Sequence, residues 1–195
     1  MADPSYIDAD GVLTDGEAWV ALHTCTPTGT KLCQMTSAND GSTLDWSQYM
    51  DLVVIVASKS VKASGDTDTL LGYFNNDTSS SYQVQYWRGN GSSVNTSRTT
   101  AAYMQVGNSL TEDASTTASA SAVWRIFNIN SGQYKNATSQ WACDKGATGS
   151  YTVGLYSFVW ENQAAITEID LNMEDENYDT GTLISLFGVL PRMVA

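Results

Sequence analysis

The amino-acid sequence predicts an all-β protein whose strands form an antiparallel sandwich. No long segment of the 195-residue chain has helical periodicity, whereas β-branched and aromatic residues recur in short runs between clusters of Gly, Asn, Asp and Ser. In the run ITEIDLNM, apolar Ile169, Leu171 and Met173 alternate with Asp170 and Asn172. Because side chains on a strand point alternately to its two faces, we expect one face of this strand to be buried and the other to face water.

The expected strands follow one another along almost the whole chain. They are residues 18–24, 31–35, 51–58, 69–74, 82–88, 101–106, 122–130, 141–143, 151–160, 166–173 and 182–190. The run LVVIV at residues 52–56 is apolar at every position, which suits a central strand covered on both faces. We therefore expect this run deep in the sandwich or beneath a partner chain.

The segments between the strands predict loops and a single domain. The polar stretch GNSLTEDASTTASAS at residues 107–121 has no apolar periodicity and predicts an exposed loop, with a short helix in its Ala-containing half as an option. The chain has only three prolines and no Pro-rich or Gly/Ser-rich linker. We expect one β-sandwich domain at residues 17–195, preceded by an extending N-terminal arm at residues 1–16.

Charge and composition exclude several functional classes. The chain carries 9 Lys and Arg against 21 Asp and Glu, a net charge of −12. Nucleic-acid binding depends on cations that displace phosphate counterions, so we expect no direct nucleic-acid partner. A hydrophobic fraction of 42% is too high for an intrinsically disordered chain. No apolar run approaches the ~18 residues of a membrane span, and the N-terminus carries acids in place of a signal peptide's Lys or Arg, so we expect folding in the cytoplasm and no membrane partner.

The sequence offers few groups for nucleophilic catalysis. His23 is the one histidine, so any Ser-His-Asp or Cys-His mechanism would have to use it. It lies two residues before Cys25 on an expected strand, which places both side chains on one face, but an ordinary core or edge histidine is the simpler interpretation. Cys25, Cys33 and Cys143 lack zinc-site spacing, and we expect buried reduced thiols with at most one disulfide.

Two acidic motifs supply oxygen atoms suited to Ca²⁺. They are DADG at residues 8–11 and EDENYD at residues 174–179, and neither has the spacing of an EF-hand loop, so solvated loops are the simpler interpretation. The sequence has no phosphate-binding loop, dinucleotide fingerprint or nucleophile elbow. It therefore predicts no catalytic, cofactor-binding or metal-binding residues, and no enzymatic activity.

The tryptophans are spread over most of the expected strands. They are Trp19, Trp46, Trp87, Trp124, Trp141 and Trp160. Packing in the core or in a protein interface is the simpler interpretation for each. Tyr86 and Trp87 are adjacent and must point to opposite faces of a strand, so some aromatic side chains are expected to face outward. Outward aromatic rings stack on the apolar faces of sugar rings, which leaves glycan binding open.

Four segments, in order, resemble a family of tailed-phage virion structural proteins that is frequent in marine and cyanobacterial phages. They are WSQYMDLVVIVAS (46–58), YFNNDTSSSYQVQYW (73–87), FNINSGQYKNAT (127–138) and AAITEIDLNMEDENYDTGTLISLFGVL (164–190). In the second segment Asn76 and Ser79 replace two glycines of the family's pattern. In the fourth, Thr182, Phe187 and Val189 replace Ser, Tyr and Ile.

This resemblance implies a jelly-roll-like sandwich in the virion. We expect a capsid decoration or cement protein on the outer surface of the phage head, bound to the major capsid protein. A closed homotrimer is expected, with residues 52–56 or 183–190 near the contact and the arm reaching toward the capsid or a neighbouring subunit. The alternative is a tail fibre or spike component that binds host surface carbohydrate.

Overall fold

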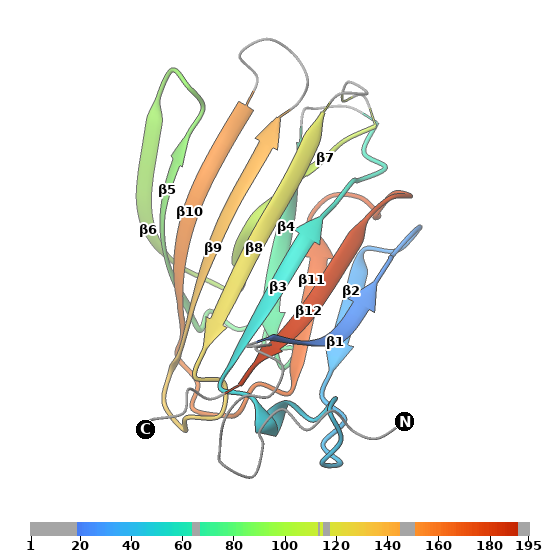
Figure 1. Cartoon of the computed structure of the whole chain (residues 1–195). Helices are drawn as coiled ribbons and strands as arrows, with labels where there is room; N and C mark the ends of the chain where they lie inside the picture. The colour runs from blue at the N-terminus through green and yellow to red at the C-terminus, as the bar shows by residue number, and fades with distance from the viewer. Residues whose placement is uncertain (1–18, 64–66, 113, 115–117, 145–150, 191–195) are drawn as a thin grey trace.

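The computed structural model describes residues 19–63, 67–112, 114, 118–144 and 151–190, and in these ranges the chain is almost entirely β-structure (Figure 1). The strands, in chain order, are β1 (Trp19–Cys25), β2 (Leu32–Thr36), β3 (Asp51–Ala57), β4 (Thr67–Phe74), β5 (Tyr82–Gly89), β6 (Val94–Ala101), β7 (Met104–Leu110), β8 (Ser119–Phe127), β9 (Lys135–Asp144), β10 (Tyr151–Trp160), β11 (Glu168–Met173) and β12 (Leu183–Val189). A short 3-10 helix, η1 (Trp46–Gln48), precedes β3. The expected N-terminal arm, residues 1–16, lies outside the described residues.

The strands form two antiparallel sheets that pack as a jelly-roll-like sandwich, which confirms the predicted fold class. The larger sheet has the order β1-β12-β3-β8-β9-β10-β5-β6, and the smaller sheet has the order β2-β11-β4-β7. In Figure 1 the larger sheet lies in front of the smaller one. The edge strand β7 of the smaller sheet packs mainly on β8 and β9. The β5–β6 side of the larger sheet therefore extends beyond the smaller sheet.

A cluster of aromatic rings fills the space between the sheets. Phe74 from β4 stacks on Trp124 from β8, with ring centroids 5.2 Å apart and an interplanar angle of 3°. Trp160 and Tyr82 meet Phe74 edge-on at 5.5 and 6.3 Å. Gly72 leaves room for the indole, because a Cβ at this position would lie 2.8 Å from the Trp124 ring. Large aromatic side chains dominate the burial energy of a core, so this cluster holds the two sheets together.

The apolar run at residues 52–56 becomes β3, a central strand between β12 and β8. Leu52, Val54 and Val56 are buried on the face toward the smaller sheet, and Val53 is buried on the opposite face. Ile55 also points to the opposite face but is 40% exposed. The predicted central position of this strand is confirmed. The prediction that both of its faces are covered is wrong at Ile55, which is exposed.

The prediction of one exposed loop at residues 107–121 is wrong. The stretch begins inside β7, which continues to Leu110, and it ends inside β8, which starts at Ser119. Gly107 lies where the two sheets come close together, because a Cβ there would be 3.2 Å from the Cβ of Ala122 and 3.4 Å from that of Trp141. Small residues fit this narrow space, so the strand carries no alternation of large apolar side chains.

Two strands of the larger sheet differ from the sequence-based prediction: β9 is longer than expected, and β6 was not expected. β9 spans Lys135–Asp144 and not only residues 141–143. β6 is not predicted by the sequence pattern, because its residues 94–100 are exposed on both faces and carry no alternation. It forms by backbone pairing with β5, from Tyr82 opposite Ala101 to Gly89 opposite Val94. It is a free edge of the sheet.

A tight turn follows β4 and fixes the path of the chain toward β5. Asn75 and Asn76 have φ angles of 50° and 55°, and the N–H of Asp77 donates to the carbonyl of Phe74 at 2.9 Å. Positive φ at both central positions is the geometry of a type I′ turn, which Asn tolerates better than most residues. Asn76 therefore preserves a tight turn where the resembled family has Gly.

Asp77 connects this turn to the core. Its carboxylate accepts hydrogen bonds from the indole N–H of Trp160 at 2.7 Å and from the hydroxyls of Ser79 and Ser81 at 2.5 and 2.7 Å. Burial acts to raise the pKa of Asp77, but these hydrogen bonds outweigh it and lower the pKa to about 2. The ionised carboxylate therefore stabilises the folded chain.

We expect Asp77→Ala to lower the free energy of unfolding by about 1–3 kcal/mol at neutral pH, because Trp160 loses its buried acceptor. Since the folded-state pKa is depressed, this contribution is fully present above about pH 4 and is lost as the pH falls toward 2. Urea denaturation at pH 7 and pH 3 measures both effects, with the exposed acid variant Glu161→Ala as the control. Equal stability of Asp77→Ala and wild type at pH 7 would contradict this role.

Candidate functional site

The outer face of the larger sheet points away from the smaller sheet and carries a band of uncharged residues. The band consists of two adjacent rows that run across the strands. Cross-strand pairing aligns one row of Ser185, Ile55, Val123, Gln140, Leu155, Trp87 and Thr96. The adjacent row is Leu183, Ala57, Ser121, Ala142, Val153, Gly89 and Val94. Residues directly opposite on neighbouring strands share a face of the sheet. We call these two rows the outer band.

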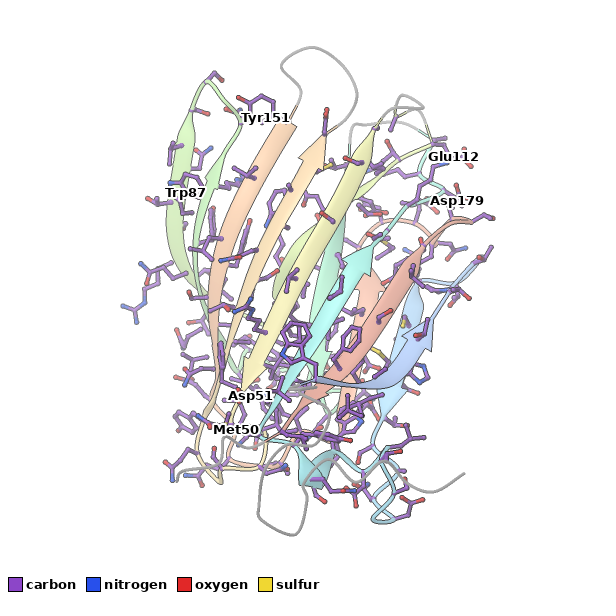
Figure 2. The ribbon with its side chains drawn as sticks, viewed as in Figure 1. Met50, Asp51, Trp87, Glu112, Tyr151 and Asp179 are labelled. Atoms are coloured by element: carbon purple, nitrogen blue, oxygen red, sulfur yellow. The ribbon has the colours of Figure 1, made fainter. Side chains whose placement is uncertain are left out.

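The large apolar side chains of the outer band are exposed. The exposed fraction is 43% for both Trp87 and Leu155 and 47% for Leu183. In Figure 2, Trp87 lies on the β5–β6 side of the larger sheet, and Tyr151 lies near the start of β10, just beyond the band. The largest exposed apolar patch on a soluble protein is often functional, so the outer band, which runs from β12 to β6, is a candidate contact surface.

Polar and charged residues border the outer band. On one side of the band, the neighbouring row of the sheet contains Arg125 on β8 and Arg98 on β6. On the same side, Asp51 lies at the start of β3, next to Met50 (Figure 2). The band crosses the strands from β12 to β6, which lie ~4.8 Å apart, so it is roughly 34 Å long and covers roughly 450 Å². This area is below the ~800 Å² that each partner buries in a standard interface. The band therefore suits the apolar centre of a contact whose rim is polar.

The thiols and the histidine lie away from the outer band. His23 is exposed on β1, and it shares a strand face with Cys25 as expected, since the two residues pair with Leu186 and Ile184 of β12. Cys25 is half-buried and lies beside the buried Cys33. Burial and this neighbouring thiol raise the pKa of Cys33 well above its usual range. Cys33 is therefore a neutral thiol of the core.

The acidic segment at residues 174–179 is held by its backbone. The carboxylate of Asp68, buried on β4, accepts from the N–H groups of Asp175 and Glu176 at 3.1 and 3.2 Å and from the hydroxyl of Ser60 at 2.7 Å. The side chains of Asp175 and Glu176 are exposed, as expected for a solvated loop. Among the described residues, no three His, Cys, Asp or Glu side chains are grouped so that they could hold a metal ion. The DADG motif lies outside the described residues.

Asp170 does not face water, contrary to the sequence-based expectation for its strand. It is 5% exposed on the outer side of the smaller sheet, where it lies between Gln34 on β2 and Tyr73 on β4. One of its carboxylate oxygens has no hydrogen-bond partner among the described residues. Burial, and then the charge of Glu168, raise the pKa of Asp170 to about 6. The ionised form of this side chain therefore costs stability at neutral pH.

The tryptophans divide between core and surface. Trp46, Trp124, Trp141 and Trp160 are buried, which confirms core packing for these four. Trp87 and Trp19 are exposed, and Trp19 contacts Phe187 with ring centroids 5.9 Å apart. Tyr86 is half-buried on the face of β5 opposite to Trp87. The sequence did contain a signal for the outer band, because YTVGLYSFVW is apolar in both phases of its alternation.

No protein-family model matches the chain, and comparisons with curated proteins and with solved structures find no match. Among the described residues, none of the helical segments has the length and apolar character needed to cross a bilayer.

We expect Asp170→Asn to raise the free energy of unfolding at pH 7 by on the order of 1 kcal/mol, because it removes a buried charge without changing the shape of the side chain. The folded-state pKa lies above the unfolded value, so the wild type regains this stability as the pH falls from about 6 toward 4, and the two proteins converge. Chemical denaturation across this range measures the difference, with exposed Glu176→Gln as the control. A variant less stable than wild type at pH 7 would show that the carboxylate has an ionic partner.

Proposed function

We propose that this chain is a phage virion structural protein that decorates the outside of the head and attaches to the major capsid protein through its outer band. The observation that carries the proposal is a charge-free, solvent-exposed apolar band on a chain of net charge −12. Interface centres are depleted in charge and enriched in aromatic side chains. The resemblance of four segments to tailed-phage virion proteins supports the same function.

The acidic charge supports a position on the outer surface of the head. A net charge of −12 repels packaged DNA, so it favours the outside of the shell over its interior. The protein would then be made and assembled in the host cytoplasm as part of the particle. The small size of the band suits this setting, because many equivalent and linked contacts on a particle hold a protein that one contact would bind only weakly.

The outer band is long enough to take two partners. Its β5–β10 end carries Trp87 and Leu155, and its β3–β12 end carries Ile55 and Leu183. We assign the first end to the major capsid protein and the second to a neighbouring copy in a homotrimer. This assignment is supported by the expectation that residues 52–56 or 183–190 lie near the trimer contact, because Ile55 and Leu183 are outward residues of those two segments.

We expect Leu155→Glu to abolish attachment to particles without unfolding the chain, because it places a charge in the centre of the apolar contact at a position already 43% exposed. Quantitative mass spectrometry of purified particles measures the copy number of wild type and variant. Tyr134→Glu, 52% exposed in the loop before β9, is the matched control and should attach normally. Full occupancy by Leu155→Glu would refute attachment through the band, and only a few wild-type copies at the tail would favour a fibre or spike component.

We expect the purified chain to be a trimer by multi-angle light scattering, and Ile55→Glu to be a monomer, because the new charge would be buried at the subunit contact. Thermal unfolding of Ile55→Glu checks that the sandwich is intact. A wild-type protein that stays monomeric at the high local concentration of a virion would contradict the homotrimer.

A further inference from the structure

The β5–β6 side of the larger sheet has an inner face that the smaller sheet leaves uncovered. β5 and β6 lie beyond β10, whereas the smaller sheet ends at β7, which packs mainly on β8 and β9. Trp87 points to the outer face, so its neighbours Tyr86 and Arg88 point to the inner face. Hollows lined by β5, β6, β7 and β10 occupy this space. We call them the inner groove.

The inner groove consists of two adjoining hollows. The larger has a volume of about 390 Å³, and its lining includes Tyr86, Thr99, Tyr103, Gln105 and Tyr156. The smaller has a volume of about 170 Å³, and its lining includes Arg88, Asn90, Asn95, Asn108 and Thr152. Two contacts join them: the Arg88 guanidinium lies 5.6 Å from the centroid of the Tyr86 ring, and the amide of Gln105 donates to the side-chain oxygen of Asn108 at 3.2 Å. The larger hollow alone has the volume of a small-ligand site.

The lining combines flat apolar rings with uncharged polar groups. Tyrosine rings form its apolar part, and amides and hydroxyls form its polar part, with no Asp or Glu side chain in either hollow. A pyranose ring binds well to a surface with both kinds of group, because its ring faces are apolar and its rim carries hydroxyls that donate and accept hydrogen bonds. Aromatic surfaces with a few directed polar groups are typical of small-molecule sites. This lining therefore favours a saccharide ligand.

Tyr156 forms part of the buried floor of the larger hollow. Its side chain is 1% exposed, and its hydroxyl interacts with the Arg88 guanidinium. Its ring stacks on Tyr86 at 5.0 Å and packs against Trp141 at 6.2 Å, so its position is fixed. Burial raises the pKa of Tyr156, and the charge of Arg88 opposes this rise. Tyr156 therefore supports the Tyr86 ring from the floor of the groove.

Arg88 adds a cation that has no carboxylate partner in the described chain. The ion pairs among the described residues join Lys59 to Asp179 and Lys62 to Asp175, and neither includes Arg88. Arg88 contacts the Tyr86 ring and the Tyr156 hydroxyl, neither of which neutralises its charge, so the groove-facing guanidinium can still bind an anionic ligand. The planar guanidinium matches a carboxylate with two parallel hydrogen bonds.

We propose that the inner groove binds an acidic saccharide, with a sugar ring packed on Tyr86 and the carboxylate of that sugar or its neighbour on Arg88. One cation in an otherwise uncharged groove suits a single carboxylate, and the net charge of −12 disfavours a polyanion. This inference goes beyond attachment to a particle and does not depend on it, because the groove and the outer band lie on opposite faces of β5.

A matched pair of ligands tests the proposal: a glucose trisaccharide that ends in glucuronic acid, and the all-glucose trisaccharide. In calorimetric titrations of the full chain, we expect the acidic ligand to bind at least about tenfold more tightly. Arg88→Gln should remove this preference and keep the weaker binding of the neutral ligand. Tyr103→Ala, at a position 38% exposed, should weaken both. Arg98→Gln, on the outer face of the same hairpin, should change neither.

Three results would overturn the proposal: wild type that binds neither trisaccharide, Arg88→Gln that keeps the preference for the acidic ligand, or a short acidic peptide that binds as tightly as the acidic trisaccharide. Thermal unfolding of each variant checks that the sandwich is intact. Attachment of Arg88→Gln to particles is measured separately and reports on the outer band, so failure of the saccharide site and failure of the proposed function are distinguishable.

Discussion

The larger sheet has twice as many strands as the smaller sheet that packs on it, and both candidate binding surfaces follow from this mismatch. Where the sheets overlap, stacking of Phe74 on Trp124 and the surrounding rings close the core. The smaller sheet ends at β7, so within the described part of the chain the inner side of β5 presents Tyr86 and Arg88 to a groove. The outer side of the larger sheet carries the outer band, which extends from Leu183 on β12 past Trp87 to β6.

The charge distribution gives these two surfaces different chemistry. The chain is strongly acidic, yet the outer band has no charged residue and the inner groove has one cation and no acid. Acidic side chains elsewhere hold the structure: Asp77 anchors a turn to Trp160, and Asp68 holds the backbone of the segment before β12. A charge-free band suits a protein contact, and a lone guanidinium beside tyrosines suits a small acidic ligand.

Strands with one buried face could be predicted from the sequence, because alternation is a direct result of the pleated backbone. β6 could not, since a polar edge strand gains its place through backbone pairing alone. Only the start of β7 was predicted, within the expected strand at residues 101–106, because Gly107 fits a narrow space between the sheets and the second half of the strand shows no alternation. Burial of Asp170 and the assembly of the groove from β5, β6, β7 and β10 depend on which strands become neighbours. The sequence predicted that Tyr86 and Trp87 point to opposite faces, but the outward position of Trp87 and its neighbours Leu155 and Thr96 required the pairing.

Hydroxyl-radical footprinting of the chain, free and attached to purified particles, tests most directly whether the outer band is the contact surface. Trp87 is 43% exposed in the free chain and Tyr134 is 52% exposed, so both rings react readily before attachment. We expect attachment to lower the oxidation of Trp87 several-fold and to leave that of Tyr134 unchanged. Equal oxidation of Trp87 in the free and attached states would contradict it.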